Sequence, residues 1–181
     1  DIASLSNSDR ASTFTQLAST VAADEGTLTS TELSSTLDTL QSMASAASNM
    51  DSNAATIIVG ALATSISGTS VAGALNGKSA SEKKDAMKNM AAKAEAVMLA
   101  VTTSILAQQS SGDAAQEFSS AGGIKLKVSK KTPSNIQGLG ESITTDDGKS
   151  VTFTMPASLP SELTSLTDVG IQTSASSLVF E

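Results

Sequence analysis

One stretch of this chain has the residue types and spacing of a catalytic pair. Ser81-Glu82-Lys83-Lys84 matches the pattern S-x-x-K of penicillin-recognising enzymes, in which a lysine amine activates a serine hydroxyl. The companion pattern S-D-N is missing, and Lys131-Thr132-Pro133 only half resembles K-T-G. A four-residue pattern arises readily by chance in so serine-rich a chain. We therefore interpret the stretch as a helix N-terminus with solvated lysines, and keep a Ser–Lys hydrolase as a minor alternative.

Other reactive residues are scarce. The sequence has no Cys and no His, so it lacks a thiolate nucleophile and the commonest general base and metal ligand. Asp24-Glu25 and Asp146-Asp147 are adjacent carboxylates, but neighbours in sequence point in different directions and make poor acid–base pairs. The first is typical of a helix end and the second of a hairpin turn. We expect no catalytic residue, no metal site and no cofactor, and hence a non-enzymatic protein.

The charge of the 181-residue chain is −7 and unevenly distributed. Residues 78–131 hold nine Lys against five Asp and Glu, whereas the flanking regions are acidic. An acidic chain with four Phe and no Tyr or Trp is poorly suited to nucleic acid, which is not expected as a partner. A possible partner-facing basic patch comprises Lys83, Lys84, Lys88, Lys125 and Lys127. A solvated surface is the alternative interpretation of these lysines.

The elements that would position these residues are helical in the first two thirds of the chain. Apolar residues at spacings of three and four predict helices over 9–22, after Thr29, after Asp51 or Ser52, and over 80–109. Two of these helices open on capping boxes, Thr29 with Glu32 and Ser79 with Glu82. Glycines between residues 68 and 77 predict a weak or irregular stretch. The predicted core residues include Leu33, Leu37, Leu40, Ile58, Leu62, Met90, Val97, Val101 and Ile105.

The hydrophobic period changes to two near Gly122. The sequence IKLKVSK at 124–130 places apolar residues on one face of a strand and lysines on the other. A loop is predicted over 133–140 and a turn over 146–148, before a second strand that contains Val151, Phe153 and Met155. DVGIQ at 168–172 and SLVFE at 177–181 are weaker strand candidates.

These patterns predict an α+β fold in two parts. Residues 1–121 form a helical subdomain, a bundle, and residues 122–181 form an antiparallel β-sandwich-like subdomain. The β part has too few predicted strands to close a sandwich by itself. The helices, another sheet or further chain must therefore cover its inner face.

The order of these parts resembles the GAIN domain, the extracellular juxtamembrane region of adhesion receptors and of polycystin and egg-jelly-receptor proteins. The resemblance rests on the helix start LTSTEL, on IKLKVSKKTPSNIQG and on VTFTMPASL. In the last of these, Phe153 to Leu159 is similar to the family's strand ending f-x-h-P-x-x-L. GAIN domains usually carry paired Cys, Trp and a His-Leu-Ser/Thr cleavage triplet. This chain has no Cys, Trp or His, so self-cleavage is not expected.

The resemblance implies a non-enzymatic extracellular structural or interaction domain, polycystin-like or of the adhesion type, which links an ectodomain to a membrane part. It implies a cell-surface location, with a ciliary or flagellar surface as one setting. Protein partners are expected, including the rest of the same polypeptide, and contact with a membrane only through segments outside this chain. A chain that begins at Asp1 without Met is consistent with a processed product or a fragment. The alternative is a secreted structural subunit of a filament, tail or surface layer.

Overall fold

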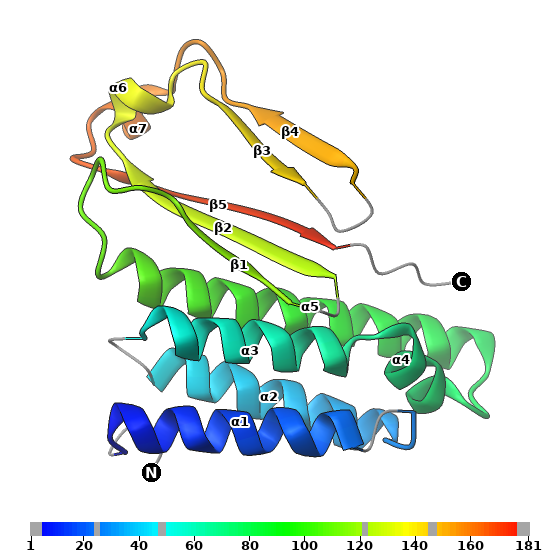
Figure 1. Cartoon of the computed structure of the whole chain (residues 1–181). Helices are drawn as coiled ribbons and strands as arrows, with labels where there is room; N and C mark the ends of the chain where they lie inside the picture. The colour runs from blue at the N-terminus through cyan, green and yellow to red at the C-terminus, as the bar shows by residue number, and fades with distance from the viewer. Residues whose placement is uncertain (1–4, 24–25, 47–49, 121–122, 145–147, 177–181) are drawn as a thin grey trace.

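The computed structural model describes residues 5–23, 26–46, 50–120, 123–144 and 148–176, and it has the predicted α+β class (Figure 1). Helices make up the N-terminal part and antiparallel strands the C-terminal part. The helices are α1 (Asn7–Ala23), α2 (Ser30–Ala46), α3 (Ser52–Ser65), α4 (Gly68–Leu75), α5 (Ala80–Leu106), α6 (Pro133–Ile136) and α7 (Ser161–Thr164). The strands are β1 (Gln116–Ser119), β2 (Ile124–Lys131), β3 (Gly140–Thr144), β4 (Ser150–Thr154) and β5 (Val169–Ser176).

The predicted helix starts are confirmed by their capping hydrogen bonds. The backbone N–H of Thr29 donates to Glu32 at 2.8 Å, and the N–H of Glu32 donates to the Thr29 hydroxyl at 3.3 Å. The same reciprocal pair joins Ser79 and Glu82 at the start of α5, at 2.9 and 3.4 Å. Asp51 caps α3 by accepting from the N–H of Ala54 at 2.7 Å. Each such cap stabilises its helix by about 1 kcal/mol.

The prediction of an irregular stretch over residues 68–77 is wrong, because α4 forms there. Ser67 caps this helix by accepting from the N–H of Ser70 at 3.2 Å. Gly73 lies inside α4, where a Cβ would come within 2.3 Å of the carbonyl oxygen of Gly26. Glycine is therefore needed here for a close approach of two backbones rather than for an irregular conformation.

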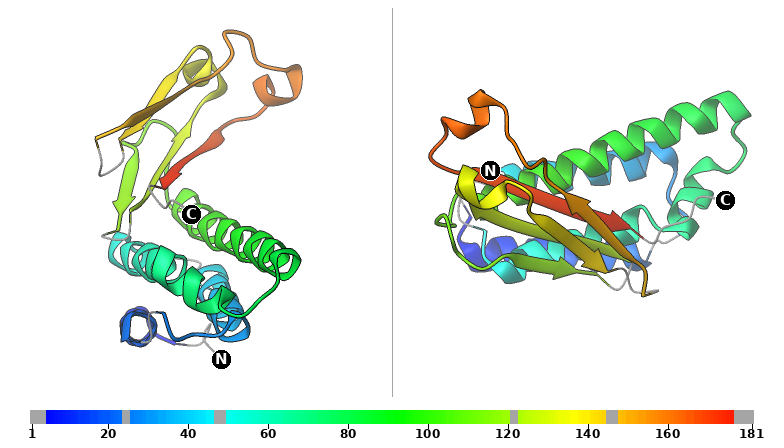
Figure 2. Two further views of the ribbon diagram at one scale, coloured as in Figure 1. Left: turned by 90° about the vertical axis from the view of Figure 1, so that its right-hand side faces the viewer. Right: turned by 90° about the horizontal axis from the view of Figure 1, so that it is seen from above.

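The four longest helices pack in two layers below the strands. Seen end-on in Figure 2 (left), α3 and α5 lie next to the first sheet, while α1 and α2 lie on their far side. Contacts between α1 and α3 and between α2 and α5 join the two helical layers. The core fills the space between them with leucine, isoleucine, valine, methionine and alanine. It includes the buried residues Leu33, Leu37, Leu40, Met43, Ile58, Leu62, Val97, Val101 and Ile105.

The first sheet is antiparallel, with strand order β1-β2-β5. The apolar face of β2 enters the same core as the helices through Ile124, Leu126 and Val128, as its alternation predicts. Phe118 of β1 is the direct partner of Leu126 and is also buried in that core. The candidate strand at 168–172 is confirmed as the start of β5, whereas the candidate at 177–181 lies outside the described residues.

The second sheet is the hairpin of β3 and β4, which lies over the first sheet on the side away from the helices (Figure 1). The strand predicted around Val151 and Phe153 is confirmed as β4. Its partner β3 was not predicted, and α6 forms within the predicted loop over 133–140. Of the predicted turn, Gly148 has a φ of +78°, and its neighbours Asp146 and Asp147 lie outside the described residues.

Candidate functional site

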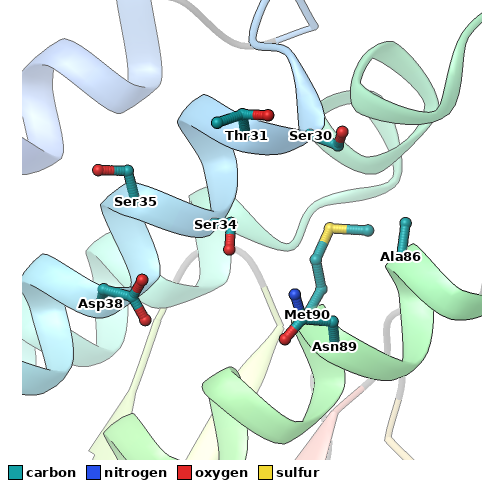
Figure 3. A pocket seen from close by; sticks show the side chains of 8 residues that line it. All are labelled: Ser30, Thr31, Ser34, Ser35, Asp38, Ala86, Asn89 and Met90. Carbon is teal, nitrogen blue, oxygen red and sulfur yellow. The ribbon is translucent and has the colours of Figure 1, made fainter.

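A groove between α2 and α5 is the first candidate site (Figure 3). Its volume is about 370 Å³, and hydroxyl groups dominate its α2 wall. Asp38 at one end forms an ion pair with Lys93, whose amine also lies 3.4 Å from the carbonyl oxygen of Ser34. The carboxylate is therefore neutralised by a residue of α5. The lining residues are Ser30, Thr31, Ser34, Ser35, Asp38, Ala86, Asn89 and Met90.

This groove can offer hydrogen bonds to a polar ligand, but it does not contain the S-x-x-K pair. Ser81 and Lys84 are both exposed near the start of α5, and neither lines the groove. Glu82 between them is bound by Ser79, whose hydroxyl and N–H hold the pKa of Glu82 below its ordinary value. A serine–lysine pair needs a site that excludes water and keeps the amine close to the hydroxyl. The structure places these two side chains in solvent instead.

The five lysines of the predicted basic patch lie on two different layers. Lys83, Lys84 and Lys88 are exposed on the N-terminal third of α5. Lys125 and Lys127 lie on the face of β2 opposite its core-facing residues, so they face the hairpin. The lysine face of β2 is thus partly covered by the second sheet rather than solvated.

Lys127 forms an ion pair that joins the two sheets. Its amine lies 2.8 Å from a carboxylate oxygen of Glu141 on β3 and 3.5 Å from Glu117 on β1. The Glu141 side chain is only 9% exposed and that of Lys127 19%. The hydrogen bond to Glu141 is the main reason that the pKa of Lys127 is raised, with burial acting in the opposite direction. Lys127 is therefore held in an ion pair between the two sheets. Among the five lysines of the predicted basic patch, the exposed ones are Lys83, Lys84 and Lys88 on α5.

The second candidate site is the β4 edge, which we define as residues Ser150–Thr154. The register pairs Glu141 with Phe153 and Ile143 with Val151, so these four side chains share one face of the hairpin. Glu141 and Ile143 are buried against the first sheet, whereas Val151 and Phe153 are 44% and 45% exposed. β3 thus covers the first sheet, and β4 extends beyond that covered area with its apolar face open.

Within β3 and β4, the opposite face carries hydroxyl groups and Gly140. The Ser142 and Thr152 hydroxyls lie 2.8 Å apart, and those of Thr144 and Ser150 lie 2.7 Å apart. Such close side chains are expected at the pairs of an antiparallel ladder that are not joined by backbone hydrogen bonds. These cross-strand bonds fix the register of the hairpin.

The backbone polar groups of the β4 edge point in alternate directions. The N–H of Met155 donates to the carbonyl of Leu139 at 2.9 Å, one residue beyond the last pair of the ladder. By the alternation of antiparallel strands, Val151 and Phe153 also direct their N–H and C=O groups at β3. The corresponding groups of Ser150, Thr152 and Thr154 then point away from β3. None of the strands in the described part of the chain pairs with β4 on that side.

The five residues of the β4 edge lack the charge, the proline and the bulge that usually prevent strand pairing. Natural proteins protect edge strands with lysine, proline, bulges or a covering element. The five residues Ser150 to Thr154 contain no charge and no proline, and two of them are exposed large or β-branched hydrophobics. The sequence signal for the strand was its alternation. The exposure of Val151 and Phe153 could not be predicted from that alternation, because their exposure depends on how far the two sheets overlap.

The described residues offer neither a metal-binding cluster nor a single membrane-spanning helix. Among the residues described, no group of three or more acidic side chains is placed to hold a metal ion. No single described helix is long and apolar enough to cross a membrane. The pair α3 and α4, bent by 46° at its break, reaches the length and apolar composition of a membrane span only when the two helices are taken together, and its apolar side chains are largely in the core.

Comparisons of the chain with models of protein families, with curated protein sequences and with solved structures found no match.

Proposed function

We propose that this chain is a non-enzymatic structural and interaction module that binds an extended protein segment at the β4 edge. The observation that carries the proposal is a five-residue strand without charge or proline, whose Val151 and Phe153 are nearly half exposed. An extended segment added to a sheet edge gains backbone hydrogen bonds from the strand and side-chain contacts from one face. At this edge the outward groups of Ser150, Thr152 and Thr154 would supply the hydrogen bonds.

The layers below the hairpin support this function by holding the edge in place. The helical core and the first sheet share one hydrophobic cluster, which includes Leu62, Val101 and Leu126. The Lys127–Glu141 pair and the buried Ile143 attach β3 to that sheet. An extended partner would therefore meet a strand that is already ordered, which lowers the entropy cost of binding.

Peptide titration tests this proposal. The ¹⁵N-labelled protein is titrated with a nine-residue peptide of the sequence GKSVTFTMP, which copies residues 148–156, and amide shifts are followed. We expect saturable shifts that are largest at Ser150, Thr152 and Thr154. A control peptide with the same composition in scrambled order should cause smaller shifts. Shifts confined to the groove between α2 and α5, or no saturable shifts, would contradict the proposal.

The cellular setting is proposed from the resemblance to GAIN domains. A helical part followed by a β-sandwich-like part is the order of that family, and VTFTMPASL carries the similar strand ending. We propose an extracellular position in a membrane-anchored surface protein, of the polycystin-like or adhesion type. The test is the coding sequence around these residues. Further strands followed by about twenty consecutive apolar residues would support the setting.

The open β4 edge would also suit the alternative function, a secreted subunit of a filament, tail or surface layer. An open strand edge also allows identical chains to add to one another, and open-ended addition of this kind builds fibres when the contact does not close. Light scattering of the purified chain at physiological salt distinguishes the two. Long polymers would favour the filament subunit, and a small closed assembly or a monomer would favour the surface-protein module.

A further inference from the structure

We propose that the β4 edge pairs with the β4 edge of a second copy of this chain. The two strands run antiparallel about a two-fold axis at Thr152 and form a four-stranded sheet with the order β3-β4-β4-β3. This inference rests on the proposed function and names the segment that the β4 edge binds. It follows from three properties of the strand, namely its side-chain order, the direction of its backbone groups and its lack of charge.

The side-chain order of SVTFT is complementary to itself. A two-fold axis at Thr152 places Val151 opposite Phe153 of the second copy, and Phe153 opposite its Val151. Aromatic and β-branched residues are favourable cross-strand partners. The axis also places Ser150 opposite Thr154, so that hydroxyl residues face hydroxyl residues. Both exposed hydrophobic side chains of each copy gain a partner in this register.

The backbone groups fit the same register. The outward N–H and C=O groups belong to Ser150, Thr152 and Thr154, as the alternation from the Met155–Leu139 hydrogen bond requires. About the axis, Thr152 meets Thr152 and Ser150 meets Thr154, so outward groups meet outward groups at each of these positions. Each such position is then a pair that exchanges two hydrogen bonds.

Neighbouring registers are poorer. A shift of the axis to Val151 places Phe153 opposite Lys149, which removes one apolar pair. A shift of the axis to Phe153 places Ser150 opposite Pro156, which has no N–H to donate. An axis between two residues would place apolar side chains opposite hydroxyls on the other face. The register centred on Thr152 is the one that pairs all five residues of β4.

The faces and charges of the two copies also agree. A two-fold axis perpendicular to the sheet keeps the apolar faces of both hairpins on the same side and both hydroxyl faces on the other. The strand SVTFT has no charged residue, so no like charges become cross-strand neighbours within it. This matters in a chain whose net charge of −7 opposes close approach of two copies elsewhere.

The direct test is the size and register of the assembly. Sedimentation equilibrium across a range of protein concentrations gives the mass. A sample that mixes ¹³C,¹⁵N-labelled with unlabelled protein gives contacts between copies by isotope-filtered NOE. We expect a monomer–dimer equilibrium, with an intermolecular NOE between the Hα of Val151 and the Hα of Phe153. Hα atoms lie closest at pairs that do not exchange backbone hydrogen bonds, which is the case for these two residues in the proposed register.

Two variants and one control test whether the dimer interface is the β4 edge. Thr152→Pro removes an outward N–H and the hydroxyl bonded to Ser142, but it keeps the backbone hydrogen bonds that join β4 to β3, at a position where edge strands tolerate proline. It should raise the dimer dissociation constant at least about tenfold. Val151→Lys, at a half-exposed position, should weaken the dimer by a similar factor of about ten without affecting β3 pairing. Leu99→Lys makes the same kind of change at an exposed apolar residue of α5, outside the β4 edge, and should stay within about threefold of the original constant.

The outcomes separate this inference from the proposed function. A chain that stays monomeric but binds the GKSVTFTMP peptide at Ser150, Thr152 and Thr154 overturns the second copy as the occupant and leaves the function standing. A chain that does neither overturns both. A dimer that is indifferent to Thr152→Pro and Val151→Lys, or that lacks the Val151–Phe153 NOE, overturns the inference because its interface lies elsewhere.

Discussion

The ion pair between Lys127 and Glu141 allows a quantitative test of how the two sheets are packed. Glu141→Ala removes the inner carboxylate, which is 2.8 Å from the amine and 9% exposed. Glu117→Ala removes the outer carboxylate, which is 3.5 Å from the same amine and 68% exposed. The two variants delete the same chemical group beside the same lysine, so Glu117→Ala is a matched control for burial.

The structure predicts different costs for these two deletions. At 2.8 Å and an effective dielectric constant of about 20, the attraction between Lys127 and Glu141 is about 6 kcal/mol before desolvation is subtracted. Removing one partner of a fully buried pair costs about 3–5 kcal/mol. Lys127 keeps some exposure and keeps Glu117, so we expect about 2–3 kcal/mol for Glu141→Ala. Glu117→Ala should cost less than about 1 kcal/mol, as for exposed pairs.

The assay is the free energy of unfolding in urea, with a double-mutant cycle that adds Lys127→Met. A loss of about 2–3 kcal/mol corresponds to a fall in melting temperature of roughly 5–10 °C for a chain of this size. Lys127→Met combined with Glu141→Leu should recover most of the loss, because no unpaired charge remains between the sheets. Equal costs for Glu141→Ala and Glu117→Ala, or a coupling energy near zero, would refute the packing of β3 on β2.

Three further outcomes follow from the fold. Gly73→Ala should destabilise the protein by about 2 kcal/mol net, because overpacking against the Gly26 carbonyl exceeds the gain in helix propensity. Gly60→Ala is the control: it has open space around it in α3 and should stabilise the protein by about 1 kcal/mol. Equal effects of the two variants in urea unfolding would contradict the close approach of Gly73 and Gly26. Ser79→Ala should cost about 1 kcal/mol in the same assay, and a change near zero would count against the capping box. The pKa of Lys127 is raised above its ordinary value in the folded state, so its contribution to stability is complete below the ordinary lysine pKa and is lost as the pH rises through the folded pKa. Glu141→Ala should abolish most of this alkaline loss of stability, measured by unfolding between about pH 8 and about pH 12. An unchanged loss would argue against the pair as its cause.

Local signals in the sequence predicted the elements that depend on neighbours in the chain. The capping boxes of Thr29 and Ser79 mark helix starts because the bonding partner is three residues away. The alternation of β2 predicted its two faces, and its apolar face is in the core. These elements could be found without knowledge of the rest of the fold.

Elements that depend on distant residues could not be predicted in the same way. Gly73 looks like a helix breaker until its contact with Gly26 is known. β3 was missed because Glu141 occupies an inward position, which hides the period of two, and its partner Lys127 lies on another strand. The same long-range pair explains why the lysine face of β2 is covered rather than solvated.

The β4 edge was not predicted as a site, although the strand that forms it was. The alternation of Val151 and Phe153 identified the strand. Apolar side chains that are buried and apolar side chains that are nearly half exposed, as these two are, have the same spacing in a strand. Which of the two occurs is decided by the overlap of the hairpin with the first sheet, and the sequence of β4 does not contain that information. The resemblance to GAIN domains remains a proposal about setting, and the β4 edge is argued from contacts independent of it.

The most direct measurement is the hydrogen-exchange rate of the Thr152 amide at a series of protein concentrations. We expect fast exchange in dilute protein, where the outward N–H meets water, and increasing protection as copies associate. The Phe153 amide, directed at β3, should be protected throughout and serves as the internal reference. A Thr152 amide that is protected equally at every dilution would contradict an open β4 edge, because another part of the same molecule would then already cover the strand.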